Sequence, residues 1–295
     1  MDGGVEEVFS AWDVQRNEFV DAHPQFAQQL GPLSQTINSF RDRTIDVSAK
    51  VDYLLWPLGL QCIESFEDIL LNAMHGRGAA AQRLMRSMYE RVALLFFLEK
   101  HPDRADELHE EASIDLDRLL TEFEKTGLTP TTLEIRENIR GKASTARAGR
   151  KRCEQCGAPR GRITVPEMVS KGEPPAESLE QGPPGYVGLA VLSGSCYLEP
   201  TFQTYATAYS VALAMRPTET GAVYDGAEQA KRAPIMLIAA HHMVLGVMYR
   251  LSERFRLGMS DELAERIEQH SECWPELKAA QGELHETGAP NDKSG

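Results

Sequence analysis

The sequence predicts an all-α protein, built as a multi-helix bundle, and three observations lead to this prediction. Apolar residues recur at spacings of three and four along most of the chain, as in helices that are buried on one side. The alternating pattern of strands is almost absent. The composition, 42% hydrophobic and 25% charged over 295 residues, is that of an ordinary globular protein with its own core.

Five helices are expected in the N-terminal half. Helical spacing covers residues 5–30, where Pro24 should kink or break the helix, and a weaker helix over 33–53 follows the punctuation of Gly31-Pro32. The other three are expected to run from Trp56-Pro57 to a cap at His75-Gly76, over 78–100, and over 103–125 after His101-Pro102.

The helix over 78–100 is the element around which the rest is expected to be organised. From Ala93 to Leu98 it is apolar on every side, which predicts that it enters the core. Arg86 and Glu90 lie four residues apart and can touch. The pair is a candidate ligand-binding site in a cleft between helices. The alternative interpretation is an ion pair that only orients helix packing.

The C-terminal half should return to helix after an apolar run, Tyr186 to Leu192, which either opens a helix or is buried coil. Ser193-Gly194-Ser195 is expected to break the chain there. Helices are then expected over 199–215, over 228–257, and over 261–270 with Ser260 as N-cap. We expect one helical domain over residues 1–278, interrupted by an insert at 136–183, and a disordered tail over 279–295.

The predicted insert at 136–183 is basic and partly irregular. Residues 136–162 contain nine Lys or Arg and two Glu in a chain whose net charge is −13. The insert should therefore contact a protein partner or nucleic acid. The alternative is pairing with the chain's own acidic helix over 103–125. The candidate contact residues are Arg147, Arg150, Lys151, Arg152, Arg160 and Arg162.

Within the insert, Cys153-x-x-Cys156 resembles one half of a zinc ribbon, because two thiolates at this spacing can hold one tetrahedral metal ion. The second half is missing nearby. Further ligands would have to be Cys196 or a histidine such as His241 or His242, or two chains would share one ion as a homodimer. Zinc is therefore the predicted cofactor, and two unpaired thiols in a loop are the alternative.

Composition also narrows the function classes. The net charge of −13 excludes an overall basic surface for nucleic acid, so such contact would have to be local. The most apolar run, residues 235–249, includes two histidines and is expected to be too short and too polar to span a bilayer. An acidic N-terminus and few cysteines predict a cytoplasmic protein. The sequence contains no phosphate-binding P-loop and no nucleophile elbow.

Two resemblances bear on function. The run Arg86-Ser-Met-Tyr-Glu90, followed by an apolar and then an acidic helix, resembles a bacterial all-helical family of unknown function. That family also has a Ser-rich turn, similar to Leu192-Ser-Gly-Ser195 here. Family members often have a histidine shortly after the turn, whereas Cys196 and Tyr197 follow it in this chain. This resemblance implies a helical fold and bacterial origin.

The second resemblance is to the HEPN class of helical ribonucleases, whose signature is an Arg followed four to six residues later by His. Arg104-Ala-Asp-Glu-Leu-His109 meets that spacing. The resemblance implies that Arg104 would stabilise phosphate charge and His109 would act as general acid or base. The leading hypothesis is nevertheless a helical binding module with a basic, zinc-bound insert. The alternative is a HEPN-like ribonuclease of a defence or toxin–antitoxin system.

Overall fold

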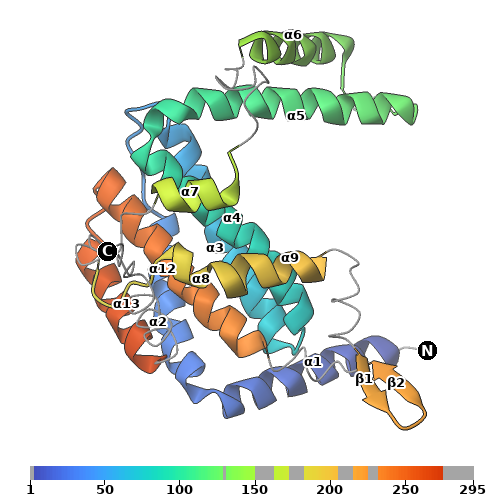
Figure 1. Cartoon of the computed structure of the whole chain (residues 1–295). Helices are drawn as coiled ribbons and strands as arrows, with labels where there is room; N and C mark the ends of the chain where they lie inside the picture. The colour runs from blue at the N-terminus through green and yellow to red at the C-terminus, as the bar shows by residue number, and fades with distance from the viewer. Residues whose placement is uncertain are drawn as a thin grey trace, which may run out of the picture.

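The computed structural model describes residues 3–128, 131–149, 163–172, 183–204, 215–224 and 232–274. These residues form a helical bundle, which confirms the all-α class (Figure 1). The one exception in this part of the chain is a short antiparallel hairpin, β1 (Met215–Thr218) and β2 (Gly221–Tyr224), in which Thr218 faces Gly221. Met215 is therefore in a strand, and the prediction of a helix to that residue was wrong.

Three long helices form the centre of the core: α3 (Asp52–Met74), α4 (Gly78–Lys100) and α12 (Ala233–Phe255). Helix α4 has the predicted bounds, and its C-terminal part is buried on every side as expected. Helix α3 ends in a Schellman motif. In it, Gly76 has φ +67°, and the Arg77 and Gly76 amides donate to the carbonyls of Asn72 and Ala73.

The first two helices differ from their predicted bounds. Helix α1 (Gly3–Ala22) ends before His23, and α2 (Pro24–Arg41) runs through Gly31-Pro32 without a break. Pro32 removes only the hydrogen bond to the carbonyl of Gln28, a residue at the exposed surface. Burial of Phe26, Leu33, Ile37 and Phe40 on one face outweighs that loss.

Helix α3 also begins earlier than Trp56. Asp52 starts it, and its carboxylate accepts hydrogen bonds from the backbone amides of Ser48 (3.2 Å) and Ala49 (2.8 Å). Pro57 therefore lies inside the helix. These side chain-to-backbone bonds are a start signal that the Trp-Pro pair concealed.

The remaining elements pack around this core. A turn of 3₁₀-helix, η1 (Pro102–Arg104), leads into α5 (Ala105–Lys125), which pairs with α6 (Leu133–Gly149). Figure 1 shows this pair projecting from the body of the protein, and we call it the arm. The other elements are α7 (Val165–Gly172), α8 (Leu189–Ser193), the π-helical segment η3 (Gly194–Leu198), α9 (Glu199–Thr204) and α13 (Ser260–Cys273).

Two predicted boundaries in this half were wrong. Ser193-Gly194-Ser195 does not break the chain, because a π-helical turn joins α8 to α9. Ser260 is the first residue of α13 and Met259 is its N-cap. The turn is held instead by Ser252, whose hydroxyl accepts the Met259 amide at 3.1 Å and lies 3.2 Å from the Ser260 hydroxyl.

The described parts of the segment 136–183 are helical. Residues 136–149 belong to α6 on the arm, and α7 packs against α4 in the core. Residues 150–162 and 173–182 lie outside the described residues. The two helices of this segment therefore contact different parts of the protein.

Gly172 allows the close approach of α7 to α4. A Cβ at this position would lie 2.7 Å from the backbone nitrogen of Phe97 and 2.9 Å from its Cα. Because backbone atoms cannot move aside easily, Gly172→Ala is expected to lower the free energy of unfolding by about 1–3 kcal/mol. Thermal unfolding measures the loss.

Gly141 is the matched control, since it lies inside α6 with no atom within 4 Å of an added Cβ. Gly141→Ala should raise stability by about 0.5–1 kcal/mol through helix propensity. Equal effects of the two substitutions would show that the contact between α7 and Phe97 is not tight.

Candidate binding interface

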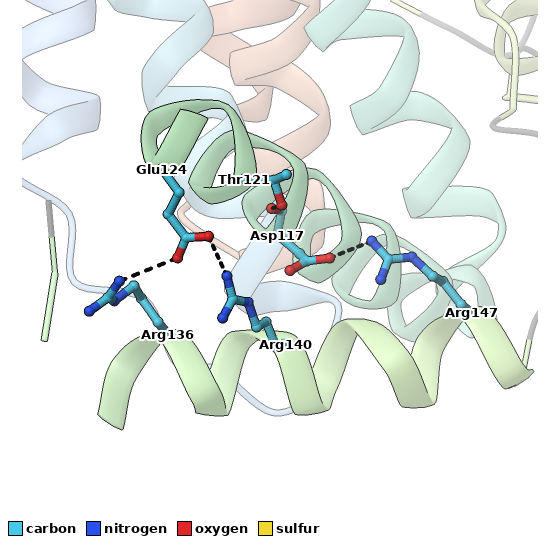
Figure 2. Close-up of polar contacts among 6 residues, drawn as sticks. All are labelled: Asp117, Thr121, Glu124, Arg136, Arg140 and Arg147. Carbon is cyan, nitrogen blue, oxygen red and sulfur yellow. Dashed lines mark hydrogen bonds and ion pairs between the residues drawn. The ribbon is translucent and has the colours of Figure 1, made fainter. Parts of the chain in front are cut away.

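The arm is joined by ion pairs between its two helices (Figure 2). Asp117 on α5 binds Arg147 at 2.5 Å. Glu124, two turns further along α5, binds Arg136 at 3.3 Å and Arg140 at 2.5 Å. The spacing of these residues places each set on one face of its helix, so the acidic face of α5 meets a basic face of α6.

These pairs bear directly on the predicted basic contact surface. Arg147 is engaged with the chain's own acidic helix, as are Arg136 and Arg140, which agrees with the alternative interpretation for these three residues. The other candidates, Arg150, Lys151, Arg152, Arg160 and Arg162, lie outside the described residues.

The apolar contact inside the arm is small. Ile114 packs against Ala143 and Ala146, and these three residues form a cluster separate from the main core. Alanine side chains allow the two helices to approach closely, but they bury little surface. The ion pairs beside this cluster include Asp117, whose residue is only 9% exposed. The arm therefore depends more on polar contacts than the body does.

A second apolar stripe runs along α5. Its spacings alternate between three and four residues, the pattern of a helix that packs against another helix. The stripe begins in the core, where Ala105 is buried and Leu108 packs against core residues. It continues into solvent, where Leu116 is 48% exposed and Leu119 is 51% exposed. Its members are Ala105, Leu108, Ala112, Leu116, Leu119 and Phe123.

Acidic residues border this stripe on one side. Glu111, Asp115 and Glu122 follow its edge at helical spacing. Asp115 binds Arg118 and Glu122 binds Lys125, both as exposed pairs within α5. The helix has eight acidic and two basic residues, so its formal charge is −6. The exposed stripe therefore lies in a negative environment.

The predicted Arg86–Glu90 pair forms, with Arg86 Nε 2.9 Å from a Glu90 carboxylate oxygen. The side chains are 20% and 39% exposed, so the pair is only partly buried. The Arg86 guanidinium also lies 5.7 Å from the centre of the Tyr197 ring, which stacks on Tyr89. Since Tyr197 is on the π-helical segment, these contacts join α4 to the segment that follows Leu192-Ser-Gly-Ser195.

Arg104 and His109 are not joined by any contact that we find in the described residues. Arg104 binds Glu107 at 2.6 Å and lies over the Phe97 ring. His109 is exposed on α5. Five residues along a helix correspond to about 140° of rotation, so the two side chains leave α5 in different directions. The ribonuclease hypothesis gains no support from this arrangement.

The predicted metal ligands Cys153 and Cys156 lie outside the described residues. Cys196 is fully buried in the π-helical segment, and burial raises the pKa of its thiol to about 12. A metal ligand must be a thiolate, so this environment disfavours Cys196 as a ligand. Within the described ranges, no group of three or more His, Cys, Asp or Glu side chains is arranged to hold a metal ion.

Three buried histidines form a cluster that the sequence did not predict. The rings of His241 and His270 lie 4.1 Å apart between centres, and those of His242 and His270 lie 6.1 Å apart. His242 Nε2 accepts the Val187 amide at 2.8 Å. Burial lowers the pKa of His241 to about 3 and that of His242 to about 4, and it lowers that of His270 well below 6.5.

The adjacent pair His241-His242 was the only sequence signal for this cluster, as a core histidine. Its third member, His270, comes from α13, and nothing in the local pattern links it to α12.

Comparison of the chain with protein-family models, curated proteins and solved structures finds no match. Function must therefore be argued from the geometry. Helix α12 has the length and apolar composition of a membrane-spanning helix, although 83% of its most apolar window is buried inside the protein. Buried core helices share these properties.

Proposed function

We propose that this protein is a non-catalytic binding module whose arm receives an amphipathic helix of a protein partner. The observation that supports the proposal most directly is the stripe on α5, which leaves the core and presents Leu116 and Leu119 to solvent. Exposed leucines at helix-packing spacing are typical of surfaces that bind another helix. The partner helix would place its apolar residues on this stripe.

The charge around the stripe supports a basic partner. Glu111, Asp115 and Glu122 would face the edge of the incoming helix, where Lys or Arg side chains would complement them. A second copy of this chain is less suited in the antiparallel arrangement of a two-fold dimer, because the same acidic edges would meet. The exposed pairs with Arg118 and Lys125 stabilise little, about 0–1 kcal/mol each, and would exchange partners readily.

The test uses a synthetic helical peptide with leucines at alternating spacings of three and four and lysines at the flanking positions. We expect saturable binding by fluorescence anisotropy. The double variant Leu116→Gln/Leu119→Gln should weaken binding at least about 10-fold, equivalent to about 1.4 kcal/mol. Binding should also weaken with added salt, because the contributing charges are exposed.

The matched control is Leu71→Gln on α3, since Leu71 is 59% exposed but lies away from the arm. It should leave binding unchanged. A peptide with glutamates in place of lysines should bind more weakly. Equal binding by the double variant and the parent would contradict the proposal. So would a dimer, measured by light scattering, that the double variant converts to a monomer.

Zinc is the second part of the proposal, with Cys153 and Cys156 as ligands. It is supported by the two-residue spacing and by the basic neighbours Arg150, Lys151 and Arg152, which favour thiolates. Purified protein is expected to contain zinc, and the double variant Cys153→Ser/Cys156→Ser is expected to lose it. Elemental analysis measures both.

One zinc per chain would indicate further ligands within the chain, and one per two chains would indicate a shared ion. Cys273→Ser is the control, because Cys273 is exposed on α13 and separate in sequence from the pair. Metal-free protein with two freely titratable thiols at positions 153 and 156 would rule out the zinc site.

A further inference from the structure

A small cavity lies where α2, α12 and α13 meet, next to the histidine cluster. Its volume is about 60 Å³. Since one water needs roughly 10–15 Å³ by this measure, it has room for a molecule of about four non-hydrogen atoms. The lining residues are Gln28, Gln29, Pro32, Leu33, His241, Arg266, Gln269 and His270.

Two buried polar atoms on the cavity lining lack a hydrogen-bond partner among the described residues. They are Nδ1 of His241 and Nε2 of Gln29. His241 is 3% exposed, so water outside the protein does not reach its ring freely. The Gln29 amide is oriented by His270, whose Nδ1 lies 2.9 Å from Gln29 Oε1. An N–H of the Gln29 amide and an N–H at His241 Nδ1 are both donors, and both need an acceptor.

Arg266 gives the cavity a positive charge. Its Nε and Nη2 bind Oε1 of Glu262, each at 3.1 Å, which leaves three of its five N–H donors for other acceptors. Glu262 is itself occupied, since it also accepts the Thr36 hydroxyl at 2.7 Å. No carboxylate is among the residues that line the cavity. Pro32 and Leu33 add an apolar wall.

We propose that this cavity binds a small carboxylate of about the size of acetate. The carboxylate oxygens would accept from Arg266, His241 and Gln29, and the short alkyl group would contact Pro32 and Leu33. An oxyanion suits this site better than a neutral molecule, because guanidinium–carboxylate hydrogen bonds are about twice as strong as neutral ones. So small a ligand cannot bind tightly, and its Kd should be about 0.1–1 mM.

The experiment follows the histidine ring signals by NMR while acetate is added at constant pH and ionic strength. We expect saturable shifts of the His241 signals. Arg266→Gln should weaken acetate binding at least about 10-fold, in line with the loss of one charge-assisted contact. Arg118→Gln is the control, because Arg118 is an exposed helix arginine paired to an acid in the same way. It should leave binding unchanged.

Acetamide, which has the same shape without the charge, identifies the ligand class. It should shift the His241 signals much less than acetate. Equal responses to acetate and acetamide would overturn the assignment of an anion. The absence of any saturable response in the parent protein, whose fold is intact, would overturn the site itself. Neither outcome depends on the arm, so this inference and the proposed function fail separately.

Discussion

Replacing Asp52 by alanine is expected to lower the free energy of unfolding by about 3 kcal/mol, measured by denaturant unfolding. Asp52 is 2% exposed, and its carboxylate binds Arg254 through two hydrogen bonds of 3.0 and 2.8 Å. It also accepts the amides of Ser48 and Ala49 at the start of α3. Alanine would leave these buried donors without an acceptor and would free the end of α12 from the beginning of α3.

Asp106→Ala is the control for this prediction. Asp106 also pairs with a cation, Lys50, but their side chains are 65% and 79% exposed. Its removal should change stability by less than about 0.5 kcal/mol, because exposed ion pairs stabilise little. If Asp52→Ala is as mild as Asp106→Ala, the bonds between α3, α12 and the preceding loop do not stabilise the fold.

Mild acid is expected to destabilise the protein through the three buried histidines. Burial lowers the pKa of His241, His242 and His270 in the folded state, to about 3 for His241 and about 4 for His242. In the unfolded state each should titrate near 6.5. Between these values the unfolded chain binds more protons, so stability is complete above about pH 6.5 and falls as the pH decreases.

The expected loss at pH 5 relative to pH 7 is about 2 kcal/mol for each histidine that stays neutral in the fold. Urea unfolding at a series of pH values measures the slope. His242→Gln should flatten it by about one proton, since Gln can still accept the Val187 amide. His109→Gln, at an exposed position, should leave the slope unchanged. Constant stability between pH 7 and pH 5 would contradict the prediction.

Asp52 does not confuse this measurement. Burial opposes its ionisation, but hydrogen bonds from Arg254 and Ala49 lower the pKa of its carboxyl below the ordinary value. The stability from that ionisation is present above the unfolded pKa, near 3.9, and is lost only as the pH falls further. The histidine window therefore lies at higher pH.

The sequence predicted best where several local signals agreed. Helix α4 was placed correctly because the glycines before it, its all-apolar second half and Pro102 after it indicate one element. Gly31-Pro32 misled because local punctuation ignores the burial of Leu33 and Ile37, which keeps α2 intact. Ser193-Gly194-Ser195 misled similarly, since the contact of Tyr197 with Tyr89 favours a continued helix.

The candidate interface could be predicted only in part. The sequence identified apolar positions on the helix over 103–125, but it could not separate the two directions in which they face. In the structure Ile114 and Leu120 are buried, whereas Leu116 and Leu119 are exposed. That division depends on where α6 docks, and α6 was expected to belong to an irregular insert. The partner of each arginine on α6 likewise depends on the tertiary fold.

The uninterrupted course of α5 has a mechanical consequence. Its first residue, Ala105, is held in the core, and the helix then extends over 21 residues, a length of about 31 Å. A rod clamped at one end acts as a lever, so a rotation of about 10° at the base displaces its tip by about 5 Å, given the helical rise. Conversely, a load on Leu116 and Leu119 produces a torque at Ala105 and at the Arg104–Phe97 contact next to α4.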